Sequence, residues 1–287
     1  MAGGPAMRLL ADGRRLHLHH GPIDLIIEAF GARAEVEAAY RQAWARFQTV
    51  LPELVAELSL LRMPVDAAHP GATGPVARRM FRACWPHRRA FITPMAAVAG
   101  AVADEVLAAM RRGRRLDKAY VNNGGDIALH LAPGARLDVG LVAELDRPAL
   151  TGMTTIASDW PVRGIATSGW RGRSFSLGIA DAATVLAEDG AAADAAATLV
   201  ANAVDVDDPA IGRERACDID EASDLGARLV TRRVDPLPPD VIEAALRRGA
   251  DIAESMRRQG LIFGAVLVLQ GGLRVVGAVA PRLAPAA

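Results

Sequence analysis

Two short segments place polar side chains and glycines where a protein backbone can hold a ligand. The first is Asn123, Gly124, Gly125 and Asp126, which lie between two apolar pieces. Asn-Gly between apolar runs predicts a hairpin, because a type I′ turn needs positive φ at its central residues. Adjacent glycines also expose backbone N–H groups that bind anions, and Asp126 can accept hydrogen bonds from a hydroxyl or an amine. On these residues alone, a plain hairpin and a ligand-binding turn both stay open.

The second segment is Thr167, Ser168 and Gly169, at the end of an apolar strand. It is not a G-x-S-x-G nucleophile elbow, because the flanking glycines are wrongly placed, so we do not expect Ser168 to be a hydrolase nucleophile. Hydroxyls in such a turn are usually caps or ligand contacts.

A third candidate is Asp194 with Thr198, in the alanine-rich segment ADAAAT. In a helix these two side chains are four residues apart and share one face. A carboxylate and a hydroxyl so placed suit a hard cation such as Mg²⁺, with other ligands from elsewhere. The alternative is a threonine that bonds back along the helix beside a solvated aspartate.

Composition narrows the class of protein. The chain has 287 residues, of which 51% are hydrophobic and 23% charged, as in a globular protein with a buried core. Basic and acidic residues balance at 33 each, so no overall charge indicates nucleic acid or an anionic membrane. Aromatic residues make up only 4%, which argues against aromatic base stacking.

The cysteines and the N-terminus indicate a cellular compartment. Cys84 and Cys217 are the two cysteines and lie far apart, so they form no disulfide framework and fit a reducing environment. The N-terminal residues lack the apolar stretch of a signal peptide, and no apolar run suits a membrane span. We therefore expect a soluble, cytoplasmic protein.

The hydrophobic pattern predicts a mixed order of elements rather than a regular strand–helix alternation, which favours α+β and one domain without a linker. Thr93 is the expected N-cap of the second helix. The polar residues 205–224 are the least structured by pattern. Predicted helices cover residues 35–60, 94–110, 189–204 and 239–259, and predicted strands lie near residues 15–19, 23–30, 119–122, 126–131, 137–144, 164–167, 175–179, 261–269 and 273–279.

The order of the motifs resembles the ApbE-like superfamily, whose best-known members are FAD:protein FMN transferases. The segments VNNGGDI, IATSG, GIADAAT and ADAAAT stand in the order of that family's N-x-GGD turn, ATSG turn, H-I-x-D-P-x-T-G strand and A-D-A-x-A-T helix. The resemblance covers roughly residues 93–204. It implies an α+β fold of mixed and antiparallel sheets packed in layers with helices, in a single ApbE-like domain.

The resemblance also implies a ligand and a metal. Residues 123–126 and 167–169 would line a cleft for FAD or another nucleotide. Asp194 and Thr198 would match the family's Mg²⁺ ligands, and backbone carbonyls near Ala97 would complete that site.

Three positions depart from the transferase pattern. Gly178 stands at the family's histidine, Ala182 at its proline and Ala99 at its lysine, and residues 205–259 have no clear counterpart in the true transferases. The chain looks more like the uncharacterised cytoplasmic branch of the superfamily, whose members carry PMAAVAGA and GGDI without the full transferase set. Members of that branch have been linked to sulfur-amino-acid metabolism.

Three hypotheses follow. The first is an ApbE-like protein of unknown reaction that binds a flavin or nucleotide-like small molecule, with Mg²⁺ as a candidate cofactor. The second is an active FAD:protein FMN transferase that modifies a threonine of a partner protein. The third is a non-enzymatic accessory protein in a hetero-complex. A protein partner and a homodimer are further expectations, and neither nucleic acid nor a membrane is an expected partner.

Overall fold

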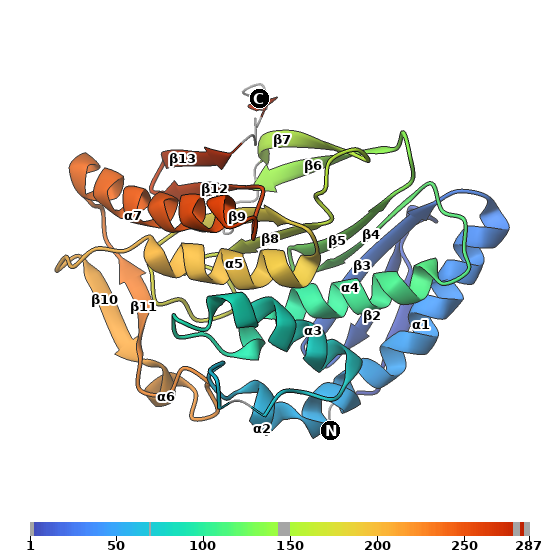
Figure 1. Cartoon of the computed structure of the whole chain (residues 1–287), viewed down its shortest axis with the longest axis horizontal. Coiled ribbons are helices and arrows are strands. Elements are labelled where there is room, and N and C mark those ends of the chain that lie inside the picture. Colours follow the sequence, from blue (N-terminus) through green and yellow to red (C-terminus); the bar gives the residue numbers. More distant parts are fainter. Residues whose placement is uncertain (1–2, 69, 143–149, 278–281, 284–287) are drawn as a thin grey trace. The chain divides into compact units, whose positions relative to one another are not determined.

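The computed structural model describes residues 3–68, 70–142, 150–277 and 282–283 (Figure 1). The chain forms two compact units that each combine segments distant in sequence. The first unit comprises residues 1–137, 156–165 and 188–194, and the second comprises residues 138–155, 166–187 and 195–287. The single domain expected from the sequence stays a prediction.

The first unit contains an antiparallel sheet in which strands follow one another in chain order. Each neighbouring pair is antiparallel, and β5 pairs in turn with the start of β8 (Gly164–Ser168). Leu25, Ile27 and Val121 are fully buried on one face, because alternate residues of a strand point to the same side. The sheet strands are β1 (Ala6–Leu9), β2 (Leu16–His20), β3 (Ile23–Phe30), β4 (Lys118–Asn123) and β5 (Asp126–Leu131).

Helices cover the buried face of this sheet. α1 packs on β2 and β3, and α4 packs on β4 and β5, as Figure 1 shows in blue and green. The buried side chains of α1 recur every three or four residues, at Ala39, Ala43, Phe47, Val50 and Leu54, which is the stripe of an amphipathic helix. The helical elements are α1 (Arg33–Ala56), α2 (Leu58–Leu61), α3 (Pro75–Cys84), η1 (Trp85–His87), η2 (Pro94–Ala97) and α4 (Val98–Arg111).

The second unit has its own sheet and helix. β12 pairs antiparallel with β9 and with β13, and α7 packs on β12 and β13. β9 and β12 are buried along their whole length, and Thr184 is the one polar residue within these two strands. The main elements are β9 (Ala182–Ala187), α7 (Pro239–Arg258), β12 (Gly264–Leu269) and β13 (Gly272–Gly277).

Smaller elements complete the chain. A hairpin of β10 and β11 encloses α6, and a small sheet has the order β14-β7-β6. α5 begins in the first unit and continues in the second. Their bounds are α5 (Gly190–Ala203), β6 (Arg136–Val142), β7 (Leu150–Ala157), β10 (Ile211–Arg215), α6 (Ala216–Ile219), β11 (Leu229–Val234) and β14 (Arg282–Leu283).

The predicted α+β class is confirmed, with antiparallel sheets and packed helices. The predicted strand at residues 175–179 is wrong, because that segment is irregular and the strand begins at Ala182 instead. Residues 205–224 were expected to be the least structured, but they contain β10 and α6. β7 and the helix α3 were not predicted. The ends of the predicted strands at residues 143–144 and 278–279 lie outside the described residues.

Candidate functional site

The turn between β4 and β5 is a two-residue hairpin, as its sequence predicted. Gly124 has φ 65° and Gly125 has φ 114°, positive values that favour glycine. The N–H of Gly125 donates to Oδ1 of Asn122 at 2.8 Å, which closes the turn from within. The backbone here is thus fixed by local chemistry, and Asn123 and Asp126 pair across the hairpin at its tip.

Asn123 ties this turn to the first turn of α4. Its side chain is 5% exposed, and its Nδ2 donates to the carbonyl oxygen of Ala99 at 3.1 Å. A buried amide needs such a partner, since an unpaired one costs free energy. In the ApbE-like pattern this position is a lysine, but this chain has Ala99. The backbone carbonyl of Ala99, and no lysine side chain, therefore contacts the turn.

Asp194 lies at the same place from the side of α5. Its Oδ2 accepts the N–H of Gly100 at 3.0 Å, and the carboxylate also accepts the N–H of Ala99. Burial, and next the negative charge of Asp126, raise the pKa of Asp194 well above its usual range. The structure therefore brings Asn123, Asp126 and Asp194 together around the start of α4.

Asp104 is a second carboxylate that contacts the start of a helix. It was not identified from the sequence as part of the site. This buried side chain accepts the N–H groups of Gly190 and Ala191, at 2.9 Å and 2.8 Å, at the start of α5. Burial, and next the charge of Asp189, raise the pKa of Asp104 to about 7, against the lowering effect of the two N–H donors and Arg79. The available signal was the segment GAVAD, which recurs as GAAAD at residues 190–194.

Thr167, Ser168 and Gly169 belong to the second unit. The hydroxyls of Thr167 and the buried Thr184 are 2.9 Å apart, and Thr167 and Ser168 are partly exposed. A Cβ on Gly169 would lie 2.4 Å from the carbonyl oxygen of Asp181, so close backbone approach requires glycine there. These contacts explain why threonine and glycine occur in the turn without a ligand. The ligand-binding role of the turn stays a prediction.

The neighbouring Asp181 is a structural hub. Its Oδ1 accepts Nε1 of Trp170 at 3.1 Å and Nε of Arg171 at 3.0 Å, and its Oδ2 accepts the N–H of Gln270 at 2.6 Å. Gln270 has φ 45°, and its side chain bonds in turn to the backbone of Asp235 and Leu237. Both carboxylate oxygens of Asp181 are thus committed to holding loops.

Gly178 occupies a position with no room for a side chain. A Cβ there would lie 2.2 Å from the carbonyl oxygen of Ala201, near the end of α5. Two further contacts hold the same segment: the side-chain oxygen of Asn202 accepts the N–H of Leu177 at 2.9 Å, and Val204 accepts the N–H of Ile179 at 2.8 Å. The backbone at Gly178 is therefore packed too tightly for any side chain.

Thr198 lies on α5, four residues after Asp194 and partly exposed, in the part of the helix that belongs to the second unit. Within the described ranges, no group of three His, Cys, Asp or Glu side chains is arranged to hold a metal ion. Asp194, Thr198 and backbone carbonyls near Ala97 stay a predicted Mg²⁺ site, with ligand types that this ion accepts.

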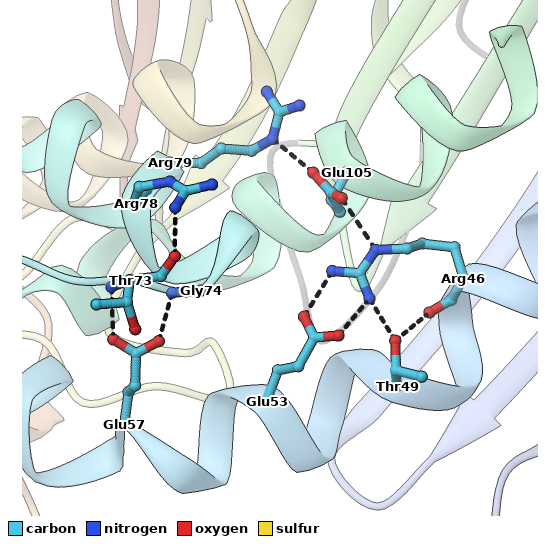
Figure 2. A network of polar contacts seen from close by, with 9 residues as sticks. All are labelled: Arg46, Thr49, Glu53, Glu57, Thr73, Gly74, Arg78, Arg79 and Glu105. Carbon is cyan, nitrogen blue, oxygen red and sulfur yellow. Dashed lines mark hydrogen bonds and ion pairs between the residues drawn. The ribbon is translucent and has the colours of Figure 1, made fainter.

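Arg79 of α3 takes part in a network of ion pairs. Figure 2 shows Glu105 between Arg46 and Arg79, at 2.9 Å and 3.0 Å from the Nε atoms of the two arginines. The other side of Arg46 pairs with Glu53 through two hydrogen bonds, at 2.9 Å and 2.7 Å. This network joins α1, α3 and α4, which accounts for Arg79 as a structural cation.

Comparisons with known proteins bear on the family and the fold. A family model described as "AbpE bacteria" matches residues 7–275. Among solved structures, the apo form of the Pseudomonas stutzeri flavinyl transferase ApbE has 12% sequence identity and a TM-score of 0.43, with 97% of this chain and 93% of that chain covered. The ApbE protein of Thermotoga maritima has 11% identity and a TM-score of 0.41, with 96% of each chain covered.

Curated relatives are named UPF0280 proteins. The one from Methanopyrus kandleri is 35% identical over 171 residues, which are 60% of this chain and 61% of that protein. The one from Methanococcoides burtonii is 40% identical over 121 residues, which are 40% of this chain and 47% of that protein. The chain thus spans about half to three fifths of the length of these relatives. None of the helices that the structure describes is long and apolar enough to cross a bilayer.

Proposed function

Because the chain belongs to the family described as AbpE bacteria, which confirms the predicted ApbE-like resemblance, we propose that it binds a flavin or nucleotide-like molecule with the help of Mg²⁺. FAD is the ligand we propose first. Support for the binding step comes mainly from one observation: the Gly-Gly turn, Asp126 and Asp194 gather at the start of α4. The turn's glycines leave no Cβ near a flat or phosphorylated ligand.

The acidic pair supports the proposed cation. Burial of Asp194, and next the negative charge of Asp126, raise the pKa of Asp194. A Mg²⁺ ion held here would offset the negative charge of these carboxylates and of a phosphorylated ligand. Asp194, Thr198 and backbone carbonyls near Ala97 are the proposed ligands, and their oxygen atoms match the preference of the ion.

The turn at Thr167, Ser168 and Gly169 is a second proposed contact. Thr167 and Ser168 present partly exposed hydroxyls. The hydrogen bond between the hydroxyls of Thr167 and Thr184 holds the first of them in one orientation. Because the turn belongs to the second unit, its contribution needs a test of its own, with Ser168→Ala and Thr167→Val.

A binding role without FMN transfer is favoured over an active transferase. Gly178 stands where the transferases carry histidine, and its position has no space for a side chain. Asp181 does not offer a free carboxylate in compensation, since Trp170 and Gln270 are bonded to its two oxygens. An active transferase would instead attach flavin covalently to an acceptor protein in a metal-dependent reaction.

Calorimetric titration of purified, flavin-free protein tests the proposal. FAD, FMN and ATP are each titrated with and without Mg²⁺. We expect FAD to bind with a Kd on the order of micromolar, corresponding to about 8 kcal/mol, and only when Mg²⁺ is present. Absence of binding by all three would refute the flavin and nucleotide proposal.

A further inference from the structure

The helices α4 and α5 carry nearly the same five residues in their N-terminal parts. Residues 100–104 read GAVAD, and residues 190–194 read GAAAD. In each helix the aspartate follows the glycine by four residues, so the aspartate and the glycine lie on the same face, about one turn apart. This face is the one on which the two helices meet.

The two glycines form the crossing point. A Cβ on Gly100 would lie 2.1 Å from the carbonyl oxygen of Gly190, and a Cβ on Gly190 would lie 3.0 Å from the carbonyl oxygen of Gly100. The backbones therefore touch directly, and this close approach brings each aspartate within reach of the other helix.

Each aspartate then caps the opposite helix. Asp104 of α4 accepts the first two N–H groups of α5, from Gly190 and Ala191. Asp194 of α5 accepts N–H groups in the first turn of α4, from Ala99 and Gly100. These are N–H groups that a helix cannot satisfy within itself, and negative charge at a helix N-terminus is favourable. Neither helix relies on a cap from its own N-cap residue for these groups.

We propose that Asp104 is a positioning residue for the candidate site: by holding the N-terminus of α5 on α4, it sets where the Asp194 carboxylate stands. Its role in ligand binding rests on the proposed function, whereas its effect on the two helix starts does not. Its contact with α5 runs through the backbone, because one oxygen accepts the N–H of Gly190 and the other the N–H of Ala191. The two aspartates and the two helix N-termini are linked by reciprocal hydrogen bonds. Loss of the Asp104 cap therefore weakens the hydrogen bonds of Asp194 to the start of α4 as well.

Glu105 provides the matched control on the same helix. It is buried like Asp104, at 8% against 9% exposed, but it faces α1 and α3 through Arg46 and Arg79 (Figure 2). Glu105→Gln therefore disturbs a buried acid of α4 without touching the start of α5. A general loosening of α4 would appear in both variants, and a positioning effect only in Asp104 variants.

Amide hydrogen exchange measured by NMR on the ligand-free protein tests the proposal. In Asp104→Asn, one acceptor is replaced by a donor, so exchange at Gly190 and Ala191 should rise by about fivefold, as for the loss of a helix cap. The decisive amides are those of Ala99 and Gly100, which Asp104 does not contact and Asp194 does. We expect their exchange to rise at least about threefold in Asp104→Asn and to stay unchanged in Glu105→Gln.

Two outcomes overturn the proposal. One is faster exchange at Gly190 and Ala191 alone, which would make Asp104 a local cap without influence on Asp194. The other is equal loosening of Ala99 and Gly100 in both variants. Should the Asn variant fold poorly, Asp104→Glu keeps the charge but lengthens the side chain, and the same comparison of the four amides decides.

Ligand titration of the same variants separates this proposal from the proposed function. If wild-type protein binds FAD with Mg²⁺, Asp104→Asn should weaken that binding by about fivefold, and Glu105→Gln should not. If wild-type protein binds none of FAD, FMN or ATP, the proposed function fails, and the exchange data still decide whether Asp104 positions Asp194.

Discussion

Asp104 and Asp194 cap each other's helices: Asp104 accepts N–H groups at the start of α5, and Asp194 accepts N–H groups at the start of α4. The exchange is possible because the helices touch through two glycines, with no side chain between them. A carboxylate that the family resemblance marks as a metal ligand thus also has a structural task. A substitution at Asp194 can remove the hydrogen bonds to α4, the negative charge, or both. Variants that change only one of these are therefore needed.

The glycine crossing predicts an unusual response to alanine. Gly→Ala in an ordinary helix stabilises by about 1 kcal/mol. Gly100→Ala should instead destabilise by about 3 kcal/mol or more, because its Cβ would overlap the Gly190 carbonyl at 2.1 Å. Gly190→Ala should cost less, since its nearest contact is 3.0 Å. Urea denaturation of both variants checks this order, and equal effects would contradict the crossing geometry.

The buried Asp104 predicts a pH dependence of stability. Its pKa is raised from 3.8 to about 7, so the folded state holds this proton more tightly than the unfolded state does. The resulting stabilisation is fully present below about pH 3.8 and is lost as the pH rises through about 7. The free energy of unfolding of the wild type should therefore fall over this range relative to Asp104→Asn, which has no proton to lose.

Asp189→Asn is the companion variant for this titration. Asp189 raises the pKa of Asp104 and also caps α5 by accepting the N–H of Ala192 at 2.8 Å. Asparagine keeps the cap and removes the charge. The fall in stability should then end at a lower pH than in the wild type. Parallel pH profiles of the wild type and Asp104→Asn would show that Asp104 does not titrate in this range.

The Gly178 position predicts that transferase chemistry cannot be restored by one substitution. Gly178→His should destabilise by about 1–3 kcal/mol or more, because its Cβ would lie 2.2 Å from the Ala201 carbonyl. Gly178→Ala should already cause most of this loss of stability, because the Cβ atom alone clashes with the Ala201 carbonyl. Thermal unfolding of both variants measures the effect. A stable histidine variant that transfers flavin to a protein would refute the binding-only account.

Local signals predicted several elements well. Ile23–Phe30 was predicted to the residue because Gly21-Pro22 precedes its largely apolar run and Gly31 follows it. The sequence Asn-Gly-Gly-Asp predicted the hairpin between β4 and β5. Thr93 stands at the predicted N-cap position, directly before Pro94 of η2, but the N–H of Gly100 at the start of α4 is accepted by Asp194. A cap that is 94 residues away in sequence leaves no local pattern.

Other features depended on tertiary packing. The segment at residues 175–179 has the apolar pattern of a strand, but side-chain oxygen bonds from Asn202 and the tight contact at Gly178 hold it in an irregular path. The repeated Gly-x-x-x-Asp of the two helices was visible in the sequence. The sequence could not show that these two segments contact each other, because small-residue segments occur in any well-packed core. The contact between Gly100 and Gly190 is a feature of the tertiary structure.

The most direct measurement is titration of FAD into wild-type protein, Asp194→Asn and Asp194→Ala, with and without Mg²⁺. Asparagine keeps an acceptor for Gly100 but removes the charge, so it should retain most stability while Mg²⁺-dependent affinity falls about tenfold to a hundredfold, as for a charge-assisted contact of about 1.5–3 kcal/mol. Alanine should lose both stability and affinity. Unchanged Mg²⁺-dependent affinity in Asp194→Asn would contradict the account, and Asp194 would then be only the cap of α4.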